Sequence, residues 1–377
     1  MRNFIVTTML VLALALALAG AGCGRKADPD ARLRSDVARY GLQEVVTRAQ
    51  EASGKQATPA NYDYLARALA LGKQPKLARQ ALEKAVSLDP AYAPSALLLG
   101  GALLKEDKPQ ATEQMMRVLV EKQPKEDQAA ELLCRALLKQ NKTAEALTFI
   151  EEVIKRNGKS LPLLWARADT LAILKDYDKA DKDYQAALRI EPKNIAMRMS
   201  YVQTLVSSGR NNEGAKLAAE TVALAPNSAD VRFLAGGALH QAGKVDEALA
   251  QYKEALIINP AMVPAANNLA LLLADRNQDT GTAVSWARKA AVLAPQSLAI
   301  ADTLGWALVR DGQLTDGLPI LREVNKAWAN NPTVWYHYGW ALAKAGQKVA
   351  GLKLIQQAAA SGSDCATDAQ KALREFS

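Results

Sequence analysis

Nowhere in this chain do β-branched apolar residues alternate with polar residues over a sustained stretch. Such alternation marks a half-buried strand, so the pattern predicts no sheet. Hydrophobic residues make up 49% of the chain but aromatic residues only 5%, so alanine and leucine supply most of the apolar surface. These two residues favour helices that pack closely. We therefore expect an all-α fold.

A pattern of small, large and turn residues returns along the chain with a period of 34. Prolines mark the period at Pro90, Pro124, Pro192, Pro226 and Pro260, with Gly158 in the open slot and Pro295 one residue late. In the unit 229–262, Gly236 and Ala248 hold the eighth and twentieth places, where small residues let two helices approach closely. Gly243 at the fifteenth place can end the first helix in a left-handed conformation, and the proline ends the second. Each unit is therefore predicted to be a helix-turn-helix.

The period and these positions resemble the tetratricopeptide repeat, or TPR. The resemblance implies a right-handed α-solenoid over residues 59–362, in which each repeat contributes a helix A and a helix B. Nine repeats are expected, starting at Pro59, Ala93, Asp127, Leu161, Ile195, Ala229, Val263, Leu298 and Pro332. The repeat at Val263 is one residue longer, and the extra residue is placed in the turn Asn277–Thr280. Residues 30–58 are expected to form a helical cap or degenerate repeat, and residues 363–377 a C-terminal capping helix.

The first residues have the pattern of an export signal. Arg2 precedes an apolar run that ends in Ala19-Gly20-Ala21-Gly22-Cys23. This pattern predicts a signal peptide over residues 1–22. The small residues before Cys23 resemble a bacterial lipobox, which implies lipidation of that cysteine, a tether over residues 23–29 and, with Gly24 following, an outer-membrane location facing the periplasm. Two alternatives are ordinary cleavage, which would leave a soluble periplasmic protein, and an apolar segment retained as a membrane anchor.

Catalytic and metal-binding patterns are lacking in the sequence. Its two histidines, His240 and His337, are about three repeats apart, and no paired-cysteine metal motif or phosphate-binding loop occurs. We therefore expect no enzyme activity, cofactor or metal. The net charge of +8 is spread without basic runs, which argues against nucleic-acid binding. Cys134 and Cys365 are too many repeats apart to pair, so Cys134 is expected to be a packing residue and Cys365 a free thiol.

The concave side of the solenoid is the predicted binding surface. In TPR proteins the second, fifth, ninth and twelfth residues of helix A line that side. Aromatic and amide side chains at these places suit the capture of a peptide. The predicted partner-binding residues are Trp165, Phe233, His240, Asn267, Asp302, Trp306, Tyr336 and Trp340. The alternative is that the aromatic residues pack between neighbouring helices; carbohydrate stacking on the tryptophans is a further possibility.

Two segments narrow the expected function. Ala266-Asn267-Asn268-Leu269-Ala270 and the stretch from Ala301 to Leu308 resemble the C-terminal repeats of bacterial exported TPR lipoproteins, some linked to exosortase and extracellular-polysaccharide systems. The resemblance implies a scaffold that binds protein partners of an envelope assembly or export complex. The alternatives are a pilus or outer-membrane assembly lipoprotein and a non-catalytic regulator of a cell-wall enzyme.

Overall fold

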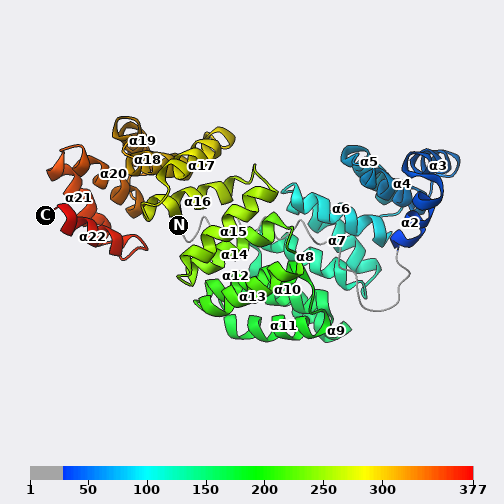
Figure 1. Ribbon diagram of the computed structural model, residues 1–377. Helices are drawn as coiled ribbons and strands as arrows, with labels where there is room; N and C mark the ends of the chain where they lie inside the picture. The colour runs from blue at the N-terminus through cyan, green and yellow to red at the C-terminus, as the bar shows by residue number, and fades with distance from the viewer. Residues whose placement is uncertain (1–28, 377) are drawn as a thin grey trace. The chain divides into compact units, whose positions relative to one another are not determined.

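The computed structural model describes residues 29–376, and these residues form helices α2 to α22 without a strand (Figure 1). The predicted signal peptide at residues 1–22 and the lipidation site Cys23 lie outside the described residues. None of the helices between Pro29 and Phe376 combines the length and apolar character needed to cross a membrane.

Nine helices of 13 residues each begin at the nine positions that the repeat register predicts. These A helices are α4 (Pro59–Leu71), α6 (Ala93–Lys105), α8 (Asp127–Lys139), α10 (Leu161–Ile173), α12 (Ile195–Ser207), α14 (Ala229–Gln241), α16 (Val263–Asp275), α18 (Leu298–Arg310) and α20 (Pro332–Lys344). The all-α repeat fold is confirmed, down to the first residue of each A helix.

A second helix follows each A helix and packs against it. These B helices are α5 (Pro75–Leu88), α7 (Pro109–Lys122), α9 (Thr143–Asn157), α11 (Tyr177–Ile190), α13 (Asn211–Leu224), α15 (Val245–Ile258), α17 (Thr280–Leu293), α19 (Leu314–Ala327) and α21 (Lys348–Ala359). Pro90, Pro192 and Pro260 each stand two residues beyond the end of a B helix. The proline ring thus stands where the ladder of hydrogen bonds stops.

The turns between helix A and helix B contain one residue in the left-handed region. Gly209, Gly243, Gly312 and Gly346 adopt φ between 75° and 84°, as their fifteenth place predicts. In the first four repeats the same place holds non-glycine residues with positive φ, namely Lys73, Asp107, Asn141 and Lys175. The longer repeat at Val263 has two such residues, Asn277 and Asp279, in the turn predicted to hold the extra residue.

Additional helices stand before and after the nine repeats. α2 (Pro29–Tyr40) and α3 (Leu42–Lys55) form a further pair, with Gly41 (φ 81°) between them, and α3 packs on α4. α22 (Ala366–Phe376) begins 34 residues after α20, at the register of a tenth helix A, and packs on α20 and α21. Helical segments thus pack on both ends of the repeat array, and the C-terminal one continues its 34-residue register.

The chain divides into two compact units, the first ending at Leu217 and the second beginning at Ala218, within α13. In the first unit, apolar residues of neighbouring repeats form clusters, one of which contains Leu104, Met116 and Leu133. In the second unit, Tyr252 and Ile355 at the twenty-fourth place are almost wholly buried. Each core is therefore shared between consecutive repeats, as expected of a solenoid.

Candidate functional site

The A helices form the inner layer of each unit. In the first unit α8 contacts α6 and α10, and in the second α18 contacts α16 and α20. Successive B helices make no comparable contacts with one another within the described range; instead each packs on the A helices beside it. Successive A helices are therefore closer together than successive B helices. In a curved array the closely spaced helices lie on the inside, so the inner face of each unit is built from A helices. The predicted site residues all belong to this layer.

In the first unit, Trp165 is buried in the inner layer rather than open to solvent. Its indole nitrogen donates to Ser200 Oγ at 3.4 Å, and the guanidinium of Arg135 lies 5.5 Å from the ring centroid. Arg135 is itself paired with Glu131 at 2.8 Å. These contacts join α8, α10 and α12, which favours the packing alternative for Trp165.

Asp169, at the ninth place of the same helix as Trp165, is a half-buried carboxylate on the inner face. Burial raises its pKa to about 6, and this outweighs the hydrogen bond that the Tyr184 hydroxyl donates to it. The Tyr184 side chain is almost wholly buried at the twenty-fourth place of its repeat. The pair therefore couples the two helices of one repeat.

In the second unit, Trp306 is the centre of a buried aromatic cluster. Its side chain has no exposed surface. Its ring stacks on His337, with centroids 4.4 Å apart and planes 10° apart, and meets Trp340 edge-on at 5.4 Å. Its indole nitrogen donates to Asp275 at 2.8 Å. Tyr336, 5.5 Å from Trp306, completes the cluster between α16, α18 and α20.

A buried histidine–aspartate pair lies beside this cluster. His337 Nδ1 and Asp302 Oδ2 are 2.8 Å apart, and both residues are buried. Burial alone lowers the pKa of His337, but the charge of Asp302 and the hydrogen bond to it outweigh burial and raise that pKa. Asp302 Oδ1 is buried without a hydrogen-bond partner. Asp302 thus holds an imidazole between helices, and Trp306 covers that imidazole.

The other predicted residues differ in exposure. Phe233 is buried, 5.9 Å from the Tyr252 ring. Asn267 is half-buried, and its side-chain oxygen has no hydrogen-bond partner. His240 is exposed, although surrounding protein lowers its pKa against the opposing charges of Asp275 and Asp364.

The structure thus brings Asp302, Trp306, Tyr336 and Trp340 together in one cluster. Trp165 lies in the other unit. The buried rings of Trp165, Trp306 and Trp340 leave no open indole face on which a sugar could stack. Of the predicted set, His240 is exposed and Asn267 is half-buried, so these two residues retain surface that a partner could contact.

Sequence reasoning missed Arg310, the last residue of α18. Its guanidinium carbon lies 5.0 Å from the centroids of both Trp306 and Trp340. The residue is half-buried, and its Nε is buried without a hydrogen-bond partner. Arg310 stands at the thirteenth place, four residues after Trp306 and thus on the same side of the helix. That spacing was the available signal.

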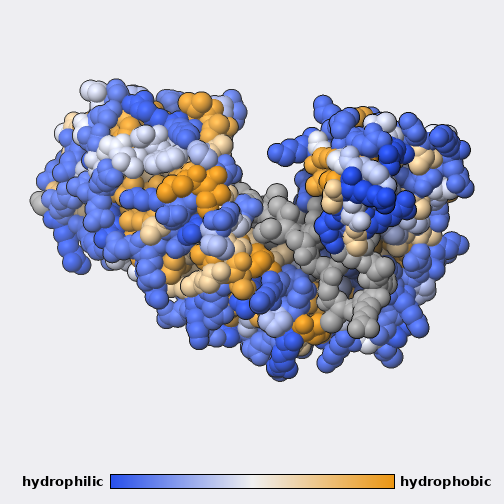
Figure 2. All heavy atoms as spheres, turned by 45° about the vertical axis from the view of Figure 1, so that its right-hand side comes forward, coloured by the Kyte–Doolittle hydropathy of each residue, from blue (hydrophilic) through white to orange (hydrophobic). Residues whose placement is uncertain are grey.

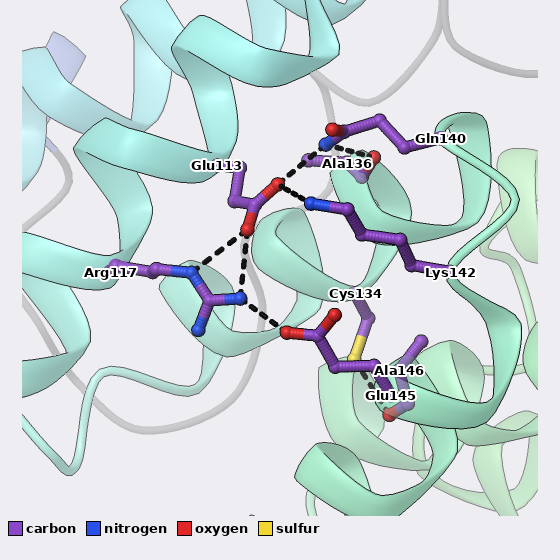
Figure 3. Close-up of polar contacts among 8 residues, drawn as sticks. All are labelled: Glu113, Arg117, Cys134, Ala136, Gln140, Lys142, Glu145 and Ala146. Atoms are coloured by element: carbon purple, nitrogen blue, oxygen red, sulfur yellow. Dashed lines mark hydrogen bonds and ion pairs between the residues drawn. The ribbon is translucent and has the colours of Figure 1, made fainter.

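A polar network between two repeats of the first unit is structural in character (Figure 3). Glu113 accepts hydrogen bonds from Lys142, Arg117 and Gln140 at 2.7–2.9 Å, and Arg117 also contacts Glu145. The hydrogen bond from Lys142 contributes most to lowering the pKa of Glu113, to about 2. These hydrogen bonds join α7 to the end of α8, to the turn that follows it and to α9, so the network holds two repeats together.

Exposed apolar side chains are found mainly towards the ends of helices. Ile257 and Val292 in the last turns of α15 and α17 are largely exposed, and Val349 stands in the first turn of α21. Apolar patches appear between charged side chains on the face shown in Figure 2. Exposed apolar residues are common on protein surfaces. We assign no site to them.

The cysteines and acidic groups of the described chain form no metal centre. Cys134 is buried as a packing residue, and Cys365 is also buried; both are free thiols. Between residues 29 and 376 no three histidine, cysteine or acidic side chains converge as metal ligands.

Comparison with known families agrees with the repeat geometry. A model described as tetratricopeptide repeat matches residues 202–263 and 303–364, and a second model with the same description matches residues 162–194. These three segments of the chain match the tetratricopeptide repeat. The matched segments include α10, α14 and α20, whose first residues the TPR register predicts.

Solved TPR structures are similar over parts of the chain. A tetratricopeptide repeat protein from Parabacteroides merdae is 14% identical, with 71% of this chain and 98% of that one covered and a TM-score of 0.47. YrrB, described as a TPR protein with an unusual peptide-binding site, is 19% identical. The match covers 49% of this chain and 95% of the YrrB chain, with a TM-score of 0.39. MamA from Desulfovibrio magneticus is 18% identical. The match covers 45% of this chain and 96% of the MamA chain, with a TM-score of 0.40. No curated protein matches the chain.

Proposed function

We propose that this TPR protein is a lipid-anchored scaffold that binds a segment of a partner protein along the inner face of its second unit. The observation that carries the proposal is a set of polar side chains in one layer that retain surface open to solvent. His240 is exposed, and Asn267 and Arg310 are half-buried. Imidazole, amide and guanidinium groups at such positions can form hydrogen bonds with the backbone or the polar side chains of a peptide.

The partner belongs to an envelope assembly or export complex in this proposal. Support comes from the export signal, the lipobox-like residues before Cys23 and the resemblance of 266–270 and 301–308 to exported TPR lipoproteins. A lipid on Cys23 would hold the repeats at the periplasmic face of the outer membrane. Repeats without catalytic groups suit recruitment of other proteins, including a polysaccharide or surface-protein export apparatus.

In-cell crosslinking tests the binding surface. We would place a photoactivatable residue at His240 or at Asn267, identify crosslinked proteins by mass spectrometry, and repeat the His240 experiment in a protein carrying Asn267→Ala. The matched control is a photoactivatable residue at Lys253, which is exposed on helix B α15. A specific envelope protein crosslinked from the inner face but not from Lys253, and reduced by Asn267→Ala, is expected. Identical products from all three positions would refute the proposed surface.

Labelling with a fatty-acid analogue tests the anchor separately. Wild-type protein is expected to incorporate the label, and Cys23→Ala protein is not. Equal labelling of the two would rule out lipidation at Cys23 and leave the binding surface unaffected as a proposal.

A further inference from the structure

His337 is buried at the contact between the eighth and ninth repeats. It belongs to α20, and its Nδ1 lies 2.8 Å from Oδ2 of Asp302 on α18. The indole ring of Trp306 covers the imidazole at 4.4 Å, with the two planes 10° apart. The second oxygen of Asp302 is buried without a hydrogen-bond partner. Among the described residues, the imidazole is thus the group that compensates this buried carboxylate.

Two carboxylates and one guanidinium act on His337. Burial lowers its pKa, but the charge of Asp302, the hydrogen bond to it and the charge of Asp275 on α16 together raise that pKa, although Arg310 opposes them. Asp275 is held in place by the Trp306 indole, which donates to it at 2.8 Å.

The other helices that pack on α20 are α19, α21 and α22, and their charged side chains are exposed. These side chains are Asp316, Arg322, Glu323 and Lys326 of α19, Lys348 and Lys353 of α21, and Asp368, Lys371, Arg374 and Glu375 of α22. Lys344 of α20 itself is exposed as well. Water and salt screen such charges, so the buried pair and Asp275 determine the charge state of His337.

We infer that His337 carries a proton in the folded protein and that loss of this proton loosens the ninth repeat from the eighth. With the proton in place, imidazolium and carboxylate compensate each other, and the indole face stabilises the cation. Without it, Asp302 is a buried charge with one oxygen unpaired, which costs free energy. The inference goes beyond the proposed function, because it concerns a contact within the second unit and requires no partner.

The direction of the pH dependence follows from the pKa of His337. Its folded-state pKa lies above the ordinary value of 6.5. The proton therefore contributes its full stabilisation below pH 6.5, and this contribution is lost as the pH rises through the folded-state pKa. The contact between α18 and α20 is thus tightest when the imidazole is charged and weakens towards alkaline pH.

The first test is a nuclear magnetic resonance titration of the full chain, which has only two histidines, His240 and His337. Their Cε1–H signals are followed from about pH 5 to pH 9, and His240→Gln assigns them. We expect a midpoint above 6.5 for His337 and one below 6.5 for His240, whose pKa is lowered by burial. A His337 midpoint at or below 6.5, or a His337 signal that does not titrate in this range, would overturn the inference.

Hydrogen exchange measured by mass spectrometry locates the effect. After correction for the intrinsic dependence of exchange on pH, amides of α20 are expected to exchange about three-fold faster relative to those of α14 at pH 8.5 than at pH 6. Asp302→Asn should abolish this change, because an amide leaves no buried charge beside a neutral imidazole. His240→Gln is the matched control and should retain it.

Unchanged relative protection of α20 at the two pH values in the wild type would overturn the inference, and so would an equal change in Asp302→Asn. If Asp302→Asn does not fold, the wild-type titration and exchange still decide the matter. Neither result bears on crosslinking from His240 and Asn267, so failure here is distinguishable from failure of the proposed binding surface.

Discussion

The indole of Trp306 lies flat on the imidazole of His337, with centroids 4.4 Å apart, while its nitrogen donates to Asp275 at 2.8 Å. The contact links the middle of α18 to α20, and the hydrogen bond links it to the end of α16. One side chain therefore joins the A helices of three consecutive repeats in the second unit.

Replacement of Trp306 is expected to act on stability before it acts on binding. Trp306→Ala would leave a cavity in the centre of the cluster and expose the His337–Asp302 pair, so we expect a loss of about 3–5 kcal/mol in the free energy of unfolding. Urea unfolding followed by circular dichroism measures it. Trp286→Ala is the control, because Trp286 is half-exposed on α17 and its loss is expected to cost less. Similar costs for both would mean that Trp306 does not join the repeats.

The contact between α20 and α21 depends on two glycines. A Cβ on Gly351 would lie 2.5 Å from the carbonyl oxygen of Gly339 and 2.7 Å from the nitrogen of Ala343, and neither backbone atom can turn away. Gly351→Ala is therefore expected to destabilise the protein by about 1–3 kcal/mol, despite the higher helix propensity of alanine. Thermal unfolding would show a lower midpoint.

Gly101→Ala provides the opposite case for comparison. A Cβ at Gly101, inside α6, would have open space around it. Because the added methyl group meets no clash, the higher helix propensity of alanine determines the outcome. We expect the free energy of unfolding to rise by about 0.5–1 kcal/mol. A Gly351→Ala protein as stable as Gly101→Ala would contradict the close approach of the two helices.

The turn after α10 holds a lysine where later repeats have glycine. Lys175 adopts φ 64°, a conformation that costs an L-residue about 1 kcal/mol relative to glycine. Lys175→Gly is therefore expected to raise the free energy of unfolding by about 0.5–1 kcal/mol, less than the strain alone because glycine gains freedom in the unfolded chain. Chemical denaturation measures the change. Lys182→Gly, within helix α11, should instead lower the free energy of unfolding by about 1 kcal/mol. If both variants were less stable than the wild type, backbone strain at Lys175 would be excluded.

Asp169 predicts a dependence of stability on pH. Because burial raises its folded-state pKa from 3.8 to about 6, the folded protein holds this proton more tightly than the unfolded chain. The ionised Asp169 carboxylate therefore lowers the free energy of unfolding. This loss develops as the pH rises from about 4 to 6 and is complete above that range. Asp169→Asn keeps an acceptor for the Tyr184 hydroxyl, so we expect it to stabilise the protein by about 1–3 kcal/mol at pH 7.

Urea midpoints at two pH values test this expectation. The advantage of Asp169→Asn should disappear at pH 4, where the wild-type carboxyl is protonated in the folded state. Asp178→Asn, at an exposed position of α11, serves as the control and should show no comparable change between pH 4 and pH 7. An Asp169→Asn advantage of equal size at both values would mean that ionisation is not its source.

Much of the candidate site was predictable from register, but its exposure was not. The fifth and ninth places correctly assign Asp302, Trp306, Tyr336 and Trp340 to helices of one layer. Whether a ring at such a place meets solvent depends on the neighbouring repeat, and here His337 and Trp340 cover Trp306. Arg310 could not be assigned to the site from the sequence, because what distinguishes it is its contact with two aromatic rings and the absence of an ion pair among the described residues.

The sequence by itself determined the repeat unit and its boundaries. Helix starts at Pro59, Ala229 and Pro332 follow from local physics, because glycine turns, small residues at helix crossings and helix-ending prolines act within one unit of 34 residues. Only the tertiary structure decided which polar groups found partners. The pairing of Asp302 with His337, and the contacts of Arg310 with Trp306 and Trp340, result from side chains meeting within and between neighbouring A helices. Such contacts depend on packing geometry, which no local pattern encodes.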